Sequence, residues 1–95
     1  MSYLPDLQIN TVTGNATMYD SIEIALADAS GGALSVTLTD PAFCQQLVIK
    51  KIDSSINSVT ILPASGTIDG ASSKVLTLQY DYKVITSDGT NYFII

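Results

Sequence analysis

The sequence predicts an all-β fold, a small antiparallel sandwich or barrel of short strands. Apolar and polar residues alternate with a period of two in several short runs, most clearly from Leu34 to Thr39. Turn signals separate these runs about every eight to twelve residues, which is the spacing typical of sandwiches and barrels. The runs are also rich in valine, isoleucine and threonine, which favour strands. A chain of 95 residues with no linker indicates one domain.

The first 13 residues are predicted to form an N-terminal arm and a first short strand. Pro5 favours an extended arm before the strand. Leu7 and Ile9 then alternate with polar residues, and the turn at residues 13–15 ends the strand. Residues 14–95 are assigned to a single β-domain.

The segment from residue 16 to residue 29 fits two patterns. Met18, Ile22 and Leu26 are spaced as on one side of a helix, whereas Ile22, Ile24 and Leu26 alternate as in a strand. We predict a strand over residues 21–28, because two β-branched residues stand at alternate positions. Residues 30–32, Ser-Gly-Gly, then supply the positive φ of a tight hairpin into the strand at 34–39.

The clearest hairpin pattern lies in the middle of the chain. Two apolar runs, Leu47–Ile52 and Ser58–Leu62, flank a polar loop at residues 53–57. Short strands are predicted beyond it at residues 67–68, 74–80, 82–86 and 92–95. In the strand at 74–80, Leu76, Leu78 and Tyr80 would share one face.

The residue types exclude the best-known routes to catalysis. The chain has no histidine and no arginine, so it lacks an imidazole base, a Ser-His or Cys-His pair and an arginine clamp for an oxyanion. The only cysteine, Cys44, is predicted to be a small buried hydrophobic residue. Asp69-Gly70 and Asp88-Gly89 are typical of tight turns and lack the alternating oxygen ligands of a calcium loop. We predict no catalytic, cofactor or metal residues, and no small-molecule substrate.

Charge is sparse and unevenly distributed. Residues 1–49 hold five acidic side chains and no basic one, and this half carries the whole net charge of −5. Nucleic acid and anionic membranes are therefore not expected as partners. The N-terminus lacks a signal-peptide pattern and no run of about 18 apolar residues occurs, so synthesis in a cytoplasm is expected.

Hydrophobic residues make up 46% of the chain, which is much apolar surface for one small domain to bury. This excess favours an oligomer, although a monomer with an apolar surface remains an alternative. The chain ends in Tyr92, Phe93, Ile94 and Ile95, which are apolar on both faces of the last strand. We expect these four residues at a subunit interface, the alternative being that one subunit covers both faces.

A resemblance to a known family rests on motifs in the second half of the chain. They are Ile49–Ser55, Asn57, Val59–Ile61, Pro63, Gly66–Gly70, Leu76, Tyr80 and Ser87–Tyr92, preceded by Asp28–Ala33 and Val36–Leu38. In this order and spacing they resemble a β-structured module of bacteriophage tail fibres, head fibres and capsid decoration (cement) proteins. The similarity covers about 70 residues, roughly Ser21 to Ile95; this sequence has Tyr92 where the module more often has tryptophan.

The resemblance implies a homotrimer with a structural role and no active site. Since the chain has no long fibre shaft, we predict a homotrimeric decoration protein that binds the major capsid protein on the virion surface. Tyr3, Leu4 and Asp6 in the arm are the predicted capsid contacts. The alternative is a head- or tail-fibre module that binds host-surface glycan through its aromatic side chains, which are Tyr80, Tyr82, Tyr92 and Phe93.

Overall fold

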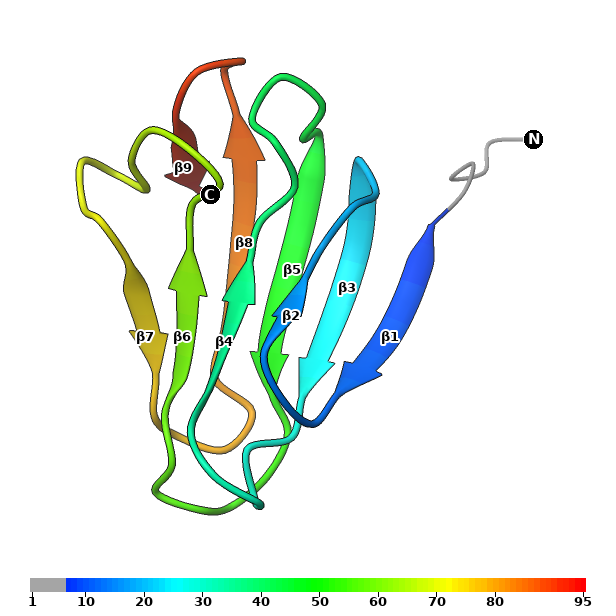
Figure 1. Cartoon of the computed structure of the whole chain (residues 1–95), viewed down its shortest axis with the longest axis vertical. Helices are drawn as coiled ribbons and strands as arrows, with labels where there is room; N and C mark the ends of the chain where they lie inside the picture. The colour runs from blue at the N-terminus through cyan, green and yellow to red at the C-terminus, as the bar shows by residue number, and fades with distance from the viewer. Residues whose placement is uncertain (1–6) are drawn as a thin grey trace.

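The computed structural model of the chain describes residues 7–95, and every element of regular secondary structure in that range is a β-strand (Figure 1). They are β1 (Gln8–Val12), β2 (Ala16–Thr17), β3 (Ile22–Ala27), β4 (Leu34–Thr37), β5 (Gln46–Lys51), β6 (Val59–Leu62), β7 (Lys74–Leu76), β8 (Tyr82–Ser87) and β9 (Tyr92–Ile94). The predicted all-β class is confirmed.

The strands form two facing sheets. The five-stranded sheet has the order β1-β3-β5-β8-β9 and the four-stranded sheet the order β2-β4-β6-β7. The prediction of an antiparallel fold is wrong for the first six strands, because β1, β3 and β5 run parallel, as do β2, β4 and β6. Antiparallel pairing is limited to the pairs β5–β8, β6–β7 and β8–β9. From β1 to β6 the chain therefore alternates between sheets and winds as three successive coils, as in a β-solenoid.

The predicted central hairpin is also wrong. β5 pairs with β3 and β8, whereas β6 pairs with β4 and β7, so the two strands lie in opposite sheets. The predicted hairpin through residues 30–32 is wrong in the same way, since β3 and β4 also face each other across the core. Each loop is a β-arch, a turn that carries the chain from one sheet to the facing sheet.

Contacts between neighbouring arches explain this outcome. The Ala29 N–H donates to Asp53 Oδ1 at 2.8 Å, and the Leu34 N–H donates to the Ser58 carbonyl at 3.1 Å. Polar groups of the β3–β4 loop thus bond to the β5–β6 loop of the next coil, so the two ends of one loop need not pair with each other.

Most predicted strands lie within one or two residues of their expected bounds. The strand predicted at 74–80 is an exception, because β7 ends at Leu76, and Leu78 and Tyr80 are exposed in the loop that follows. Residues 67–68 form no strand, although Ile68 makes isolated bridges to Ala71 and Tyr92. Asp69 and Gly70 occupy a tight turn with φ of 50° and 81°, as predicted for an Asp-Gly pair.

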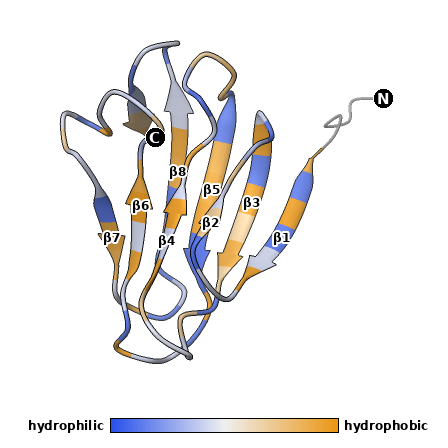
Figure 2. Cartoon of the chain, viewed as in Figure 1, coloured by the Kyte–Doolittle hydropathy of each residue, from blue (hydrophilic) through white to orange (hydrophobic). Residues whose placement is uncertain are grey.

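The hydrophobic core lies between the two sheets. Figure 2 shows hydrophobic residues along the strands of both sheets. The five-stranded sheet contributes Ala25, Ala27, Leu47, Ile49, Ile85 and Tyr92, and the four-stranded sheet contributes Leu34, Val36, Val59, Ile61 and Leu76. Because both sheets are narrow and short, the core is one layer of side chains thick, and the second face of each sheet is left at the surface.

Candidate functional site

The outer face of the five-stranded sheet is the most unusual surface of the molecule. We use this name for the strand residues whose side chains point away from the four-stranded sheet. They are Ile9, Thr11, Ile22, Ile24, Leu26, Gln46, Val48, Lys50, Tyr82, Val84, Thr86 and Phe93. Seven of the twelve are aliphatic or phenylalanine, which is a composition expected of a covered surface.

Strand β3 presents its larger side chains to this outer face. Its buried positions hold Glu23, Ala25 and Ala27, whereas its partly exposed positions hold Ile22, Ile24 and Leu26. Alternation alone identified two faces of this strand but could not tell which one faced the core. The usual arrangement, in which the larger aliphatic side chains are inside, is reversed here.

The strand register aligns apolar residues across the whole sheet. Ile9 pairs with Ile24, Ile24 pairs with Val48, and Val48 pairs with Val84. The N–H of Ile95 then donates to the Val84 carbonyl at 2.8 Å, which places the chain end beside the same row. We call Ile9, Ile24, Val48 and Val84 the apolar row. It crosses four adjacent strands and reaches the fifth.

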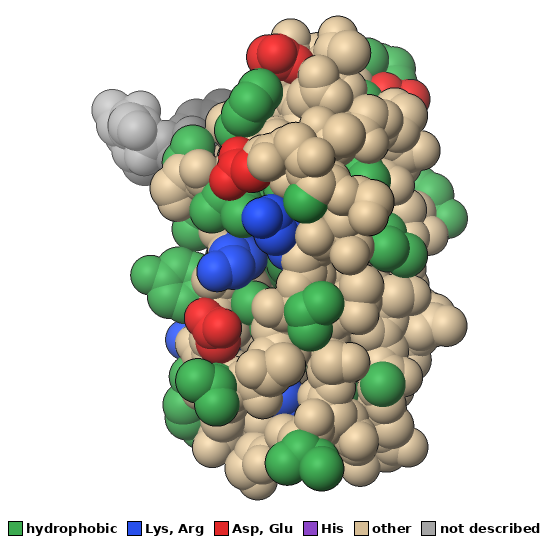
Figure 3. Space-filling model, turned by 90° about the vertical axis from the view of Figure 1, so that its left-hand side faces the viewer, with side chains coloured by type: hydrophobic (Ala, Val, Ile, Leu, Met, Phe, Trp, Pro, Cys, Tyr) green, Lys and Arg blue, Asp and Glu red, His purple; other side chains and the backbone are tan. Residues whose placement is uncertain are grey.

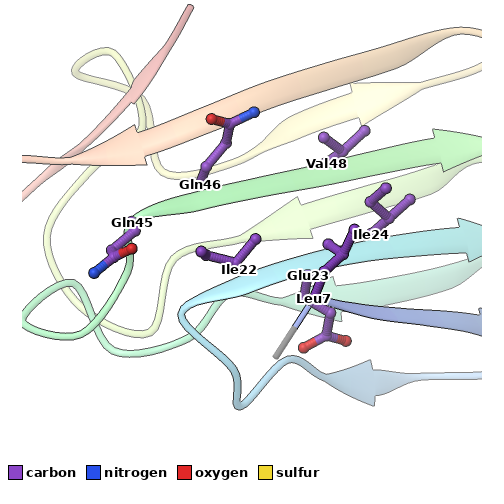
Figure 4. Close-up of a pocket in the computed structure, with 7 residues that line it drawn as sticks. All are labelled: Leu7, Ile22, Glu23, Ile24, Gln45, Gln46 and Val48. Atoms are coloured by element: carbon purple, nitrogen blue, oxygen red, sulfur yellow. The ribbon is translucent and has the colours of Figure 1, made fainter. Parts of the chain in front are cut away.

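A shallow pocket of about 340 Å³ opens beside this row. It is lined by Leu7, Ile22, Glu23, Ile24, Gln45, Gln46 and Val48. In Figure 4, Ile22, Ile24 and Val48 project from one side of β3 and β5, while the Glu23 carboxylate lies on the other side. The side chains on the pocket side are therefore aliphatic or amide groups, which suit contact with an apolar surface better than acid–base chemistry.

The carboxylate of Glu23 has structural partners. Its Oε2 accepts a hydrogen bond from Asn10 Nδ2 at 3.2 Å, and its Oε1 accepts one from the Asp20 N–H at 3.4 Å. These bonds join β1 and the β2–β3 turn to β3. Because both oxygens are occupied, Glu23 fits a role in attaching the first coil to the second.

A buried ion pair lies where the β5–β6 arch begins. Lys51 is fully buried, and its Nζ donates to Asp53 Oδ2 at 2.7 Å and to the Asp53 carbonyl at 3.3 Å. The Ser55 hydroxyl also donates to Asp53 Oδ2, and the Ala29 N–H donates to Oδ1. The Lys51 ammonium and the Ser55 hydroxyl hold the pKa of Asp53 well below its usual value, and they outweigh the opposing effect of burial.

This ion pair is better suited to a structural role than to catalysis. Asn57 Nδ2 donates to the Ala29 carbonyl at 2.9 Å, so the same group of side chains fixes two consecutive arches to each other. Lys51 Nζ and the Ser55 hydroxyl both donate to Asp53 Oδ2, so the two side chains are held by the same carboxylate oxygen. The sequence motifs include Lys51, Asp53 and Ser55 but did not indicate an ion pair, because Lys51 stands in an apolar run and the Ala29 partner of Asp53 comes from a separate loop.

Two exposed tyrosines flank a lysine at one end of the outer face. Lys50 Nζ lies 5.5 Å from the ring centroid of Tyr80 and 5.8 Å from that of Tyr82. Tyr80 is 60% exposed and has a φ of 69°, a conformation that large side chains rarely adopt. We call these three residues the tyrosine–lysine cluster.

The four C-terminal residues predicted at a subunit interface have different environments. Tyr92 is fully buried within the subunit, where its hydroxyl donates to the Thr39 carbonyl and accepts from the Ala64 N–H. Ile94 packs against the core. Phe93 and Ile95 are 41% and 69% exposed, and they are the two whose side chains remain widely accessible to a partner. The predicted capsid contacts Tyr3, Leu4 and Asp6 lie outside the described residues.

The predicted environment of the single cysteine is confirmed. Cys44 is buried, and this burial raises the pKa of its thiol to about 11. A thiol with so high a pKa is almost entirely protonated at neutral pH, so it is a poor nucleophile.

Other kinds of site find no support in residues 7–95. These residues contain no group of three or more histidine, cysteine, aspartate or glutamate side chains placed to hold a metal ion. Over the same range, no helix is long and apolar enough to cross a membrane. Figure 3 shows one side of the molecule on which lysine and acidic side chains lie among hydrophobic side chains and polar and backbone atoms.

Comparisons of the chain with protein-family models, with curated proteins and with solved structures found no match. The similarity to the phage virion module therefore stays a hypothesis based on sequence motifs. The outer face and the tyrosine–lysine cluster are the structural observations relevant to function.

Proposed function

We propose that this chain is a non-enzymatic structural protein of a bacteriophage, a capsid decoration protein that acts as a homotrimer. Three copies would bind the major capsid protein on the virion surface and stabilise the head, after synthesis in the host cytoplasm. A protein that binds only the assembled shell shifts the equilibrium toward that shell by mass action.

The observation that carries this proposal is the outer face of the five-stranded sheet. Seven of its twelve side chains are aliphatic or phenylalanine, and apolar surface that is left exposed on a sheet face marks a site of protein contact. A structural protein in a multi-subunit particle needs such contacts, whereas an enzyme of this size needs a cleft with convergent polar groups. The sequence motifs from Ser21 to Ile95 supply the phage context.

The first test of this proposal is the native mass of the purified chain by light scattering. A trimer of this 10.1 kDa chain has a mass of about 30 kDa. The second test is cosedimentation with heads of the encoding phage that have been prepared without the protein. We expect binding and a higher temperature of DNA release, and heads that neither bind the chain nor gain stability contradict the proposal.

A deletion of residues 1–6 tests the predicted capsid contacts. We expect this variant to remain folded and to keep the native mass of the full chain, but to lose binding to heads. Undiminished binding would place the capsid contact elsewhere on the molecule.

The tyrosine–lysine cluster favours a second candidate function, a fibre module that binds host-surface glycan. Aromatic rings stack on the apolar face of sugars, and a lysine between two rings offers hydrogen bonds to sugar oxygens. Holding Tyr80 at a positive φ costs about 1–2 kcal/mol, a type of strain that clusters at binding sites. A glycan array with the wild type and Tyr80→Ala tests this alternative. Tyr19→Ala is the control, since Tyr19 is 82% exposed and lies outside the cluster.

A further inference from the structure

The orientation of β3 indicates that its outer positions are covered in the functional state. Each buried methylene contributes about 0.8 kcal/mol to stability, so an isolated domain gains more by turning Ile22, Ile24 and Leu26 inward than by burying Glu23, Ala25 and Ala27. In the observed orientation, one subunit alone lacks the additional stabilisation that burying these three aliphatic side chains would provide. It becomes favourable when another surface removes the outward isoleucines and leucine from water.

The outer face is also nearly free of charge. Among its residues in β1, β3, β5, β8 and β9, Lys50 alone is charged, and its ammonium lies over two tyrosine rings at one end of the face. The net charge of −5 is therefore carried elsewhere on the chain. Two copies that approach through this face meet little electrostatic repulsion, even though the whole molecules carry the same sign of charge.

The opposite surface of the sandwich is different. On the four-stranded sheet four of the six outward positions carry a hydroxyl group and two are aliphatic. They are Thr17, Ser35, Thr37, Thr60, Leu62 and Val75. Hydroxyl-bearing side chains hydrogen-bond to water and do not need a covering partner. The five-stranded sheet thus has the more apolar of the two broad surfaces, with seven aliphatic or phenylalanine side chains among twelve.

The broad side of the molecule that carries the outer face has room for a stable contact. The principal-axis extents of the molecule are 35 × 34 × 19 Å, and the sheets lie across the two long directions (Figure 1). The outline of this broad side is about 1,200 Å² with its loops included, so an interface that buries ~800 Å² per partner would use most of it. A flat aliphatic sheet needs a flat apolar partner, and the same face of a second copy has that shape and composition.

We propose that copies of this chain associate through the outer face of the five-stranded sheet, with Ile24 and Val48 of the apolar row at the centre of the contact. This inference rests on the homotrimer in the proposed function and adds the surface that forms it. Three such faces directed toward one three-fold axis enclose a common apolar core. Phe93, beside the row on the same face, and Ile95 at its end would join the same interface.

The test compares Val48→Asp with Thr60→Asp. Both positions lie in the middle of a strand and are partly exposed in the subunit, but they are on opposite broad surfaces of the molecule. Light scattering gives the mass of each variant, and circular dichroism shows whether it is folded. We expect about 30 kDa for wild type and Thr60→Asp, and about 10 kDa for a folded Val48→Asp.

A second variant covers the case in which Val48→Asp does not fold. Ile9 is 61% exposed at the edge of the same row, so Ile9→Glu buries no charge in the isolated subunit. We expect Ile9→Glu to raise the dissociation constant of the oligomer at least tenfold. A dissociation constant equal to that of the wild type would overturn the inference.

The head-binding assay separates this inference from the proposed function. If Val48→Asp keeps a mass near 30 kDa but no longer binds heads, the outer face contacts the capsid, so the inference fails while the decoration role stands. A wild-type chain that is monomeric at all accessible concentrations refutes the inference directly. If that monomer still binds heads, the role on the capsid is retained without the trimer.

Discussion

Gly66 is the position where a single added methyl group should damage the fold most clearly. Its φ is 70°, in the left-handed region that residues with a Cβ adopt at a cost of about 1–2 kcal/mol. A Cβ at this position would lie 2.6 Å from Asn91 Oδ1 and closer still to the backbone oxygen of Thr90. The turn before β9 must therefore move if Gly66 is replaced by alanine.

The contacts that such a movement breaks set the expected magnitude. Asn91 Oδ1 accepts hydrogen bonds from the Thr67 N–H at 3.0 Å and from Thr67 Oγ1 at 3.3 Å. Losing both costs about 2 kcal/mol, so with the backbone strain we expect Gly66→Ala to lower the free energy of unfolding by about 3 kcal/mol. For a domain of this length, that corresponds to a decrease in Tm of about 12–24 °C.

Thermal and urea unfolding of Gly66→Ala and Gly14→Ala measure the effect. Gly14 is a matched control, because its φ is not positive and an added Cβ would have no heavy atom within 4 Å. We expect Gly14→Ala to stay within about 0.5 kcal/mol of wild type. If Gly66→Ala is as stable as this control, the close packing of the Gly66 turn against the Asn91 turn is not a source of stability, and the argument is refuted.

Three further predictions follow from buried polar groups. The pKa of Asp53 is lower in the folded than in the unfolded chain, so its stabilising effect is complete above about pH 4 and is lost as the pH falls further. Urea unfolding between pH 7 and pH 2 should show this loss, and the free energy of unfolding of Asp53→Asn should depend less on pH. Tyr92→Phe should lose about 1–3 kcal/mol by chemical denaturation, since it leaves the Thr39 carbonyl and the Ala64 N–H without the hydroxyl; an unchanged midpoint would mean that water replaces it. Cys44 should react with a thiol reagent at pH 8 only at the rate of unfolding or local opening, and rapid modification of the native protein would contradict its buried position.

The strands were predictable because their signals are local. Alternation of apolar and polar residues identified β3, β4 and β8 to within about two residues, and the Asp69-Gly70 pair identified its own turn. The helical alternative for residues 16–29 was rejected correctly on the same grounds. The strand predicted at 74–80 extended too far, because Leu78 and Tyr80 fit the alternation although they lie in an exposed loop.

The candidate site was only partly predictable. The apolar C-terminal residues indicated a covered surface, and Phe93 and Ile95 do lie exposed beside the outer face. Tyr92 could not be separated from them by pattern, since its burial depends on Thr39, which is 53 residues away in the sequence. The apolar row could not be predicted from the sequence either, because its four residues come from four separate strands.

The sequence by itself determined that this protein is built from short strands, where most of them lie, and that histidine and arginine are missing. The tertiary structure decided which strands pair, because a polar loop of hairpin length and a β-arch have the same local pattern. Asp53 is satisfied by Ala29, 24 residues earlier, and that contact exists only when two coils are stacked. The tertiary structure also decided which face of β3 points inward. Alternation defines two faces of the strand, and only packing against the other sheet selects one of them.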